Sequence, residues 1–176
     1  MILRDATPAD IPALSRLAVD SFVAKFGPLY SAQDLATFLE ESLSEAAVAA
    51  DMANPDRLYQ LAEGEGGALM GFCKIGLICG FPDHARGSRV MELKQLYTAP
   101  EATGQGIGGA LMDWAMDQFA ARGADEVQIS VYSENFGAHR FYARYGFEKV
   151  ADITFKVGEQ LDPEFLFAQM IGPNPA

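Results

Sequence analysis

Cysteine and histidine are scarce in this sequence of 176 residues, which contains two of each. Cys73 and Cys79 fall in one predicted strand, residues 68–80, where they would stand about 20 Å apart. A disulfide needs Cα atoms within about 7 Å, so we expect no bond between them and a reducing, cytoplasmic location. His84 and His139 are too isolated to suggest zinc, and no metal site is predicted.

Long apolar runs and export signals are also lacking. No run of about 18 apolar residues occurs, and the N-terminus has neither the basic nor the apolar part of a secretory signal. We therefore expect a soluble protein without a membrane partner. Basic residues are few, because 13 Lys and Arg stand against 24 Asp and Glu, for a formal net charge of −11. Nucleic-acid binding depends on neutralising phosphates, so no nucleic-acid partner is expected. Small cationic ligands suit this charge, which alone would also keep the protein soluble.

A single domain over residues 1–176 is the expectation, because the length suits one domain and no repeat or linker interrupts it. The apolar pattern predicts an α+β fold with one mixed, mostly antiparallel sheet of about six or seven strands and flanking helices. The predicted strands cover residues 2–4, 57–62, 68–80, 90–97, 127–132, 147–157 and 164–171. Two helices are predicted to begin near Pro8 and Ser31, and three more to cover 45–52, 106–122 and 136–145. Turns are predicted at 64–67 and 158–163.

Four glycines, at positions 104, 106, 108 and 109, crowd the start of the helix predicted over 106–122. Free N–H groups and the positive end of the helix dipole meet at such a start, which favours an anion. The alternative is a flexible turn or a close helix contact. The strands on either side, ending at Tyr97 and Tyr132, should run parallel, because a strand–helix–strand unit crosses over right-handed.

The same glycines also fit the dinucleotide pattern Gly104-x-Gly106-x-x-Gly109. That pattern should follow its strand directly, but residues 98–103 intervene here. The acids about 20 residues further on, Asp125 and Glu126, begin the next strand instead of ending it. Nicotinamide binding is therefore the weaker interpretation. No Gly-Lys-Ser/Thr completes a nucleotide P-loop, and no Gly-x-Ser-x-Gly indicates a serine hydrolase.

A second segment, Asn135-x-x-Ala138-x-x-Phe141-Tyr142-x-x-x-Gly146-Phe147, stands beside the loop Thr103-Gly-Gln-Gly-Ile-Gly108. Together they resemble the GCN5-related N-acetyltransferase (GNAT) superfamily, which has Arg/Gln-x-x-Gly-x-Gly in its acetyl-CoA loop and the same Asn-to-Phe pattern later. The order of predicted elements agrees along nearly the whole chain. Thr103 departs from the family's Arg or Gln, and this puts one pyrophosphate contact in doubt. Residues 21–26, 92–97 and 158–168 look most like the bacterial spermidine/spermine acetyltransferase branch.

The resemblance implies an acetyl-CoA site. Backbone groups of Leu96, Tyr97 and Thr98 would pair with the pantetheine arm, where the parallel strands splay after Tyr97 and Tyr132. The other cofactor-binding residues that it implies are Thr103, Gly104, Gln105, Gly106, Ile107, Gly108, Gly109, Asn135, Ala138, Phe141, Tyr142 and Arg144, with Arg140 near Arg144. Asn135 also suits a helix N-cap, and the two arginines also suit an exposed surface.

The resemblance places Tyr142 at the family's general-acid position, where a phenol of pKa about 10 can protonate a leaving thiolate. Glu92 stands near the point where family members often have a base, acting directly or through water. Its apolar neighbours Met91 and Leu93 put its side chain on the opposite face of the strand. A core aromatic and a surface carboxylate are the structural alternatives. Phe26, Tyr30 and the acids of residues 34–51 would line the acceptor pocket, or form an ordinary helical face.

The function implied is acetyl-CoA-dependent transfer of an acetyl group, by direct attack, to a primary amine, with a small polyamine as the leading acceptor. A protein N-terminus, a lysine or an aminoglycoside is the alternative acceptor. A non-catalytic CoA-binding sensor is a further alternative. The oligomeric state is left open, a homodimer included.

Overall fold

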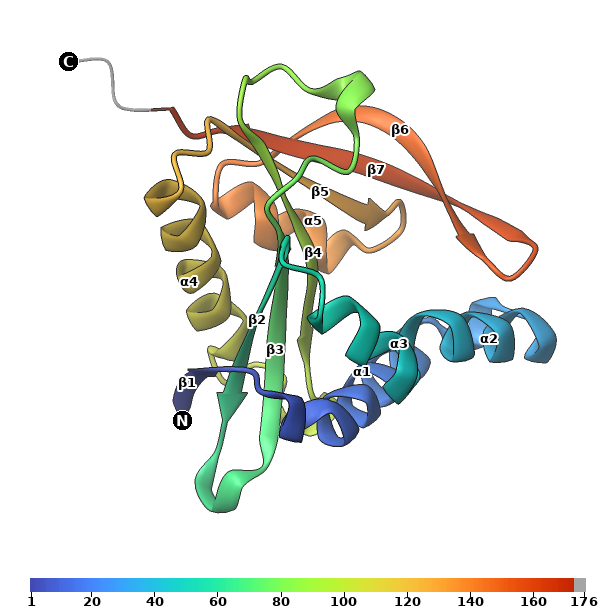
Figure 1. The fold of residues 1–176 in the computed structure, drawn as a ribbon. Helices are drawn as coiled ribbons and strands as arrows, with labels where there is room; N and C mark the ends of the chain where they lie inside the picture. Colours follow the sequence, from blue (N-terminus) through green and yellow to red (C-terminus); the bar gives the residue numbers. More distant parts are fainter. Residues whose placement is uncertain (173–176) are drawn as a thin grey trace.

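A computed structural model describes residues 1–172 of the chain, so residues 173–176 of the predicted domain lie outside the described residues. One seven-stranded sheet has the order β1-β2-β3-β4-β5-β7-β6, with helices on both of its faces (Figure 1). The strands are β1 (Ile2–Asp5), β2 (Arg57–Glu63), β3 (Leu69–Gly76), β4 (Val90–Thr98), β5 (Glu126–Tyr132), β6 (Glu148–Val157) and β7 (Gln160–Met170). The helices are α1 (Ile11–Phe26), α2 (Ala32–Phe38), α3 (Glu45–Met52), α4 (Ile107–Ala121) and α5 (Phe136–Arg144).

The sheet is mixed, as predicted. Within residues 1–172, β4 and β5 form its one parallel pair, and the other neighbouring strands run antiparallel. The parallel pair is joined through α4, which confirms the predicted crossover. The helix ends as expected, because Gly123 follows it with a positive φ of 70°.

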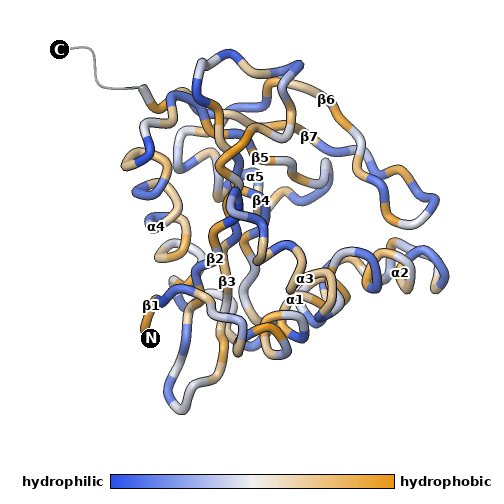
Figure 2. Tube along the Cα trace, in the orientation of Figure 1, coloured by the Kyte–Doolittle hydropathy of each residue, from blue (hydrophilic) through white to orange (hydrophobic). Residues whose placement is uncertain are grey.

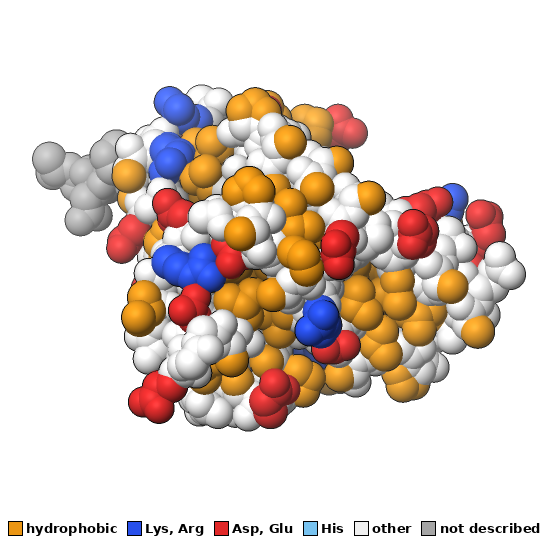
Figure 3. Space-filling view, turned by 60° about the horizontal axis from the view of Figure 1, so that its bottom comes forward, with side chains coloured by type: hydrophobic (Ala, Val, Ile, Leu, Met, Phe, Trp, Pro, Cys, Tyr) orange, Lys and Arg blue, Asp and Glu red, His pale blue; other side chains and the backbone are white. Residues whose placement is uncertain are grey.

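The helices divide between the two faces of the sheet. The first three contact β2, β3, β4 and β6, whereas α4 and α5 lie together on the other face, where Tyr145 donates a hydrogen bond to Asp113. Apolar residues at helical spacing explain the packing of α1, whose buried residues include Leu14, Leu17 and Phe22. Hydrophobic and hydrophilic positions alternate along the trace (Figure 2). From below, hydrophobic side chains spread between separate charged ones (Figure 3).

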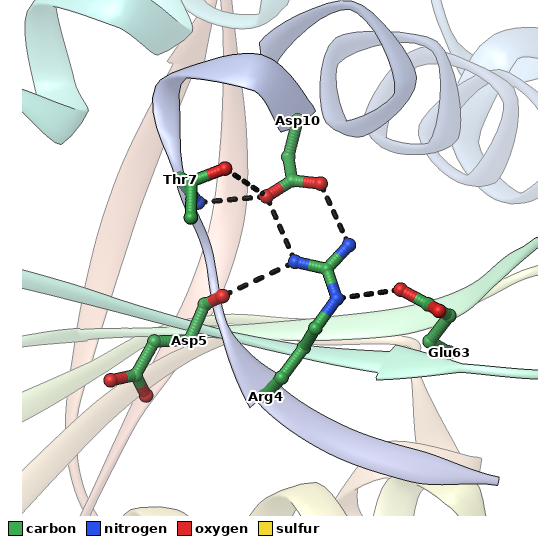
Figure 4. Close-up of polar contacts among 5 residues, drawn as sticks. All are labelled: Arg4, Asp5, Thr7, Asp10 and Glu63. Atoms are coloured by element: carbon green, nitrogen blue, oxygen red, sulfur yellow. Dashed lines mark hydrogen bonds and ion pairs between the residues drawn. The ribbon is translucent and has the colours of Figure 1, made fainter. Parts of the chain in front are cut away.

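Arg4 ties the first strand to its neighbours (Figure 4). Its guanidinium donates to both carboxylate oxygens of Asp10, at 2.9 and 2.8 Å, and to Glu63 of β2 at 2.5 Å. Asp10 also accepts from the backbone N–H of Thr7 at 2.7 Å. The hydrogen bonds from Arg4 hold the pKa of the Asp10 carboxyl well below its usual range. This cluster therefore anchors the turn that leads into α1.

The C-terminal hairpin differs from the prediction. Residues 158–163 were expected to form a turn, but β7 already begins at Gln160 and pairs with Val157 of β6. A proline has no N–H for a ladder, so a strand through Pro163 is disfavoured on general grounds. The carbonyl of Pro163 accepts from the backbone N–H of Ser133, just beyond the end of β5. An N–H at position 163 would point to the same side, where β5 has already ended. The strand therefore continues through the proline.

The strand predicted over 68–80 is shorter in the structure and ends at Gly76. Cys79 consequently lies in the loop after β3, and both cysteines are free thiols. In the described part of the chain, no helix is long and apolar enough to cross a membrane. Residues 1–172 also contain no group of three or more His, Cys, Asp or Glu side chains placed to hold a metal ion.

Candidate active site

The parallel strands are paired only near their beginnings. The ladder between β4 and β5 consists of Val90–Glu126, Met91–Val127 and Glu92–Gln128. Beyond it β4 stays beside β3, and β5 stays beside β7. The prediction that the strands splay after Tyr97 and Tyr132 is therefore wrong in its position, because they part earlier, after Glu92 and Gln128.

An extra residue in β4 explains the early separation. Lys74 of β3 pairs with Gln95 and the next residue, Ile75, pairs with Leu93, so Lys94 has no partner in β3. A bulge of this kind bends its strand and increases its twist. The later part of β4 therefore turns from β5, and its β5-facing edge is left without a strand partner.

A cleft of about 940 Å³ occupies this opening. Several of the predicted site residues line it: Glu92, Leu96, Tyr97, Thr98, Thr103, Asn135, Ala138 and Tyr142. Its walls also include side chains from α1, α2, β5, β6 and β7. The cleft thus joins residues from both ends of the chain across the gap in the sheet.

The glycine loop has the free backbone donors that an anion needs. Gly104 and Gly106 have positive φ angles of 83° and 80°, a conformation that favours glycine. No backbone N–H from Thr103 to Gly109 donates to an acceptor within residues 1–172. A Cβ built on Gly104 or Gly106 would meet nothing within 4 Å. The loop and the first turn of α4 therefore fit a diphosphate through backbone amides alone.

The other predicted cofactor residues are divided between this loop, α5 and the core. Phe141 lies next to Gly108, where an added Cβ would be 3.9 Å from its ring. Ile107 is 1% exposed, so only its backbone can serve a ligand. Gln105 is exposed, as are Arg140 and Arg144. Asn135 caps α5 by accepting from Ala138 at 3.3 Å, so its N-cap role is confirmed.

Tyr142 of α5 lines the cleft, near Cys73 of β3 and Tyr97 of β4. Its side chain is 6% exposed. Burial raises the pKa of its phenol, and the nearby Cys73 and Tyr97 add to the shift. Its hydroxyl has no hydrogen-bond partner within residues 1–172, although it lines the cleft. A phenol in this state keeps its proton at neutral pH and can donate it.

Glu92 also lines the cleft, on the side of β4 opposite Met91 and Leu93, as predicted. It is 6% exposed. Its carboxylate forms an ion pair with Lys94 at 2.8 Å. This carboxylate is therefore already engaged by a cation two residues along the same strand.

The end of the cleft on the α1 face is aromatic. Phe26 of α1 lies edge-on to Tyr132 of β5, with ring centroids 6.0 Å apart. Phe38 of α2 lies similarly against Phe155 of β6, at 5.8 Å. Tyr30 donates a hydrogen bond to Asp162 of β7. The first helices and the C-terminal hairpin thus form one chamber, which we call the acceptor chamber after the role that the resemblance implies for it.

The acids expected to line this chamber do not. None of Asp34, Glu40, Glu41, Glu45 and Asp51 lines the cleft. Asp34 instead accepts from the backbone of Glu159 in the β6–β7 turn at 2.8 Å. Asp51 binds Lys74 at 3.1 Å. Helical spacing could not reveal these partners, because they come from distant strands.

The carboxylate that does line the acceptor chamber is Glu164 of β7, which sequence reasoning missed. It accepts a hydrogen bond from Ser130 of β5. Burial, reinforced by the charge of Asp162, raises the pKa of Glu164 to about 7. The alternation of Asp162 and Glu164 on one face was a signal, but it was lost when residues 158–163 were interpreted as a turn.

Comparisons with known proteins agree with this geometry. The sequence model described as "Acetyltransferase (GNAT) family" matches residues 18–147. An uncharacterized N-acetyltransferase from Mycobacterium bovis is 29% identical over 161 residues, covering 91% of this chain and 97% of the relative. An uncharacterized N-acetyltransferase from Lactobacillus delbrueckii subsp. lactis is 22% identical over 166 residues, covering 92% of each chain.

The fold also matches solved structures. The PaiA N-acetyltransferase from Thermoplasma acidophilum, determined in complex with coenzyme A, superimposes with a TM-score of 0.77. Its sequence is 22% identical, and the match covers 97% of this chain and 98% of that one. At this identity the likeness concerns the fold.

Proposed function

Because the chain belongs to the acetyltransferase (GNAT) family, we propose that it transfers the acetyl group of acetyl-CoA to a primary amine, with a small polyamine as the leading acceptor. The observation that carries the proposal is the cleft between β4 and β5. It extends from Thr103, at the start of the glycine loop, to the acceptor chamber of aromatic rings and carboxylates, and Tyr142 also lines it.

The donor end supports acetyl-CoA through the backbone. The free amides of residues 103–109 would hold the diphosphate, and the unpartnered edge of β4 from Leu96 to Thr98 would bind the pantetheine arm. Thr103 lines the cleft where the family has Arg or Gln, and its hydroxyl donates to the carbonyl of Ala99 at 3.4 Å. The diphosphate would therefore depend on the amides more than on a long side chain.

The bound thioester supplies an electrophilic carbonyl for the amine to attack. An N–H on the free edge of β4 can stabilise the charge that develops on the carbonyl oxygen. Tyr142 donates its phenolic proton to the departing thiolate. The amine must reach the carbonyl without its extra proton, so a carboxylate has to accept that proton. Glu92 is the base predicted from the sequence, acting directly or through water.

A cationic acceptor suits the acceptor chamber. Aromatic faces attract ammonium groups, and Asp162 and Glu164 supply negative charge beside them. The net charge of −11 also favours a polycation in solution. A small polyamine has several ammonium groups and a slender apolar chain, so it matches both features.

The test is an acetylation assay with acetyl-CoA and a panel of amines. We expect turnover with spermidine, spermine and putrescine that exceeds turnover with an N-terminal peptide, a lysine peptide and an aminoglycoside. A preference for one of the latter would replace the polyamine proposal and keep the transferase. Calorimetry that finds tight CoA binding while no amine is acetylated would favour a CoA sensor. Sedimentation of the same sample would test a homodimer.

The acetyltransferase unit proposed is residues 1–176. Residues 18–147 match the family, but β1, β6 and β7 extend beyond both limits of that match and complete the same sheet. Deleting β7 would remove Glu164 together with the central partner of β5 and β6. Localisation in the cytoplasm stays a prediction, which fractionation of cells would test.

A further inference from the structure

One carboxylate in the acceptor chamber has no basic partner. None of the ion pairs formed within residues 1–172 includes Glu164, and its side chain lines the cleft. The Ser130 hydroxyl donates a hydrogen bond to it. We propose that Glu164, rather than the ion-paired Glu92, binds the ammonium group of the acceptor and takes the proton that the amine must lose. This inference rests on the proposed function.

Strand pairing places Glu164 in the acceptor chamber, and its charge acts on the end of β4. It pairs with Tyr132 of β5 and Ile153 of β6, so its side chain shares a face with the rings of the acceptor chamber. Burial raises the pKa of Tyr97, near the end of β4, and the charge of Glu164 adds to the shift. Glu164 is therefore close enough to the edge of β4 for its charge to be felt there.

The groups around Glu164 favour a proton acceptor that works near neutral pH. Burial and the charge of Asp162 raise its pKa to about 7, whereas the hydrogen bond from Ser130 favours its ionised form. A base with a pKa close to the working pH is both available and strong enough to accept a proton. The titratable and charged groups that face it or line the same cleft are Asp162 of β7, Tyr132 of β5, Tyr30 after α1, Lys25 of α1, Lys74 of β3, Tyr142 of α5, and Glu92, Lys94 and Tyr97 of β4.

The proton balance of the proposed step is simple. An ammonium N–H bond breaks and an O–H bond forms on Glu164. The freed lone pair forms the new N–C bond to the acetyl carbon, the C–S bond breaks, and the thiolate takes the proton of Tyr142. The nitrogen, which still carries one proton too many for an amide, loses it through water to the Tyr142 phenolate, and Glu164 releases its own proton to water. A bound ammonium group is thereby held and deprotonated by the same carboxylate.

The experiment is a pH profile of kcat/KM for the best amine, measured from pH 5.5 to 9. We expect kcat/KM of the unchanged protein to rise through about pH 7, as Glu164 ionises. Glu164→Gln should lower kcat/KM by about 100-fold or more and abolish this rise. Glu92→Gln should retain the rise. Glu159→Gln is the matched control, because Glu159 lies in the same hairpin with a side chain that is 93% exposed, and it should behave like the unchanged protein.

Each outcome decides the proposal. It is overturned if Glu164→Gln keeps the rise near pH 7, or if Glu92→Gln alone removes it. A CoA titration of each variant tests folding independently. If Glu164→Gln fails to bind CoA, Ser130→Ala provides the second measurement. Loss of its hydrogen bond to the ionised carboxylate should move the rise to higher pH, and an unmoved rise would overturn the proposal.

Failure of this inference differs from failure of the proposed function. An unchanged protein that binds CoA but acetylates no amine would refute the transferase proposal. A protein that acetylates amines and loses nothing with Glu164→Gln would refute the role of Glu164 alone.

Discussion

Glu92 of β4 and Gln128 of β5 form the last pair of residues that joins the two parallel strands. Beyond this pair, the bulge at Lys94 turns β4 from β5, and the cleft opens between them. Tyr142 lines that opening, with the glycine loop on one face of the sheet and the acceptor chamber on the other.

Replacing Tyr142 by Phe tests the acid. We expect turnover to fall by about 100-fold or more, because the leaving thiolate loses its proton donor, while CoA affinity stays within about threefold. The measurements are steady-state kinetics and CoA calorimetry. Tyr59→Phe is the matched control, since that buried hydroxyl donates to Asp51 and does not line the cleft. Equal turnover in the Tyr142→Phe variant and the unchanged protein would remove Tyr142 from the reaction.

Replacing Gly108 tests whether this glycine is required for CoA binding or only for packing. In the free protein an added Cβ would be 3.9 Å from Phe141, which is ordinary contact. Gly108→Ala should therefore raise the free energy of unfolding by up to about 1 kcal/mol, through helix propensity, yet weaken CoA binding because the methyl group occupies the approach to the amides.

The comparison variant for Gly108 is Gly104→Ala. Its φ of 83° predicts a loss of about 1 kcal/mol in unfolding free energy. Thermal unfolding and CoA calorimetry measure both effects. A Gly108→Ala variant that binds CoA normally would mean that this glycine serves the fold alone.

Gly158 tests the contact between α2 and the β6–β7 turn. An added Cβ would lie 2.5 Å from the Cα of Asp34, whereas at Gly66, in the β2–β3 turn, it would meet nothing within 4 Å. Both glycines have positive φ angles, of 58° and 76°, so each Ala variant carries backbone strain of roughly 1 kcal/mol. We expect Gly158→Ala to lose more stability than Gly66→Ala, and to raise the KM of the amine while CoA binding is preserved. Equal losses would show that the contact contributes little.

Asp10 makes stability depend on pH. Arg4 holds the folded-state pKa of Asp10 below the unfolded value of about 3.9. The stabilisation is therefore complete above about pH 4 and is lost as the pH falls through the folded-state pKa. Asp10→Asn should lower the free energy of unfolding at pH 7 by roughly 1 kcal/mol, with a smaller difference in acid.

Denaturant titrations at pH 7 and pH 3 measure this effect. Asp152→Asn is the control, because Asp152 pairs with Lys149 on the surface and its side chain is 78% exposed. A difference between the Asp10→Asn and unchanged proteins that did not shrink in acid would contradict the assignment.

Local patterns predicted much of the fold and of the donor end. The N-cap at Ser31, the start of α3 at Glu45 and the helix between the parallel strands follow from signals within a few residues of each other. The glycine loop was predicted for the same reason, because its free amides belong to consecutive residues of one short segment.

The acceptor chamber could not be predicted in the same way, because it depends on contacts between distant segments. Asp34 looks like part of an acidic helical face, but its partner is Glu159 at the other end of the chain. Glu164 stands first in the strand predicted over 164–171, but its place on one face with Asp162 appears only once β7 is known to begin at Gln160. The bulge at Lys94 depends on the register between two strands, which no local pattern records.

Phe165 and Glu164 are neighbours in β7, yet they face opposite sides of the sheet, Phe165 towards His139 of α5 and Glu164 towards the acceptor chamber. Donor and acceptor would thus enter from opposite sides, and neither blocks the path of the other. Both substrates can be present at once, so no acyl-enzyme has to store the acetyl group while they exchange places. Double-reciprocal plots at several amine concentrations should accordingly intersect instead of running parallel.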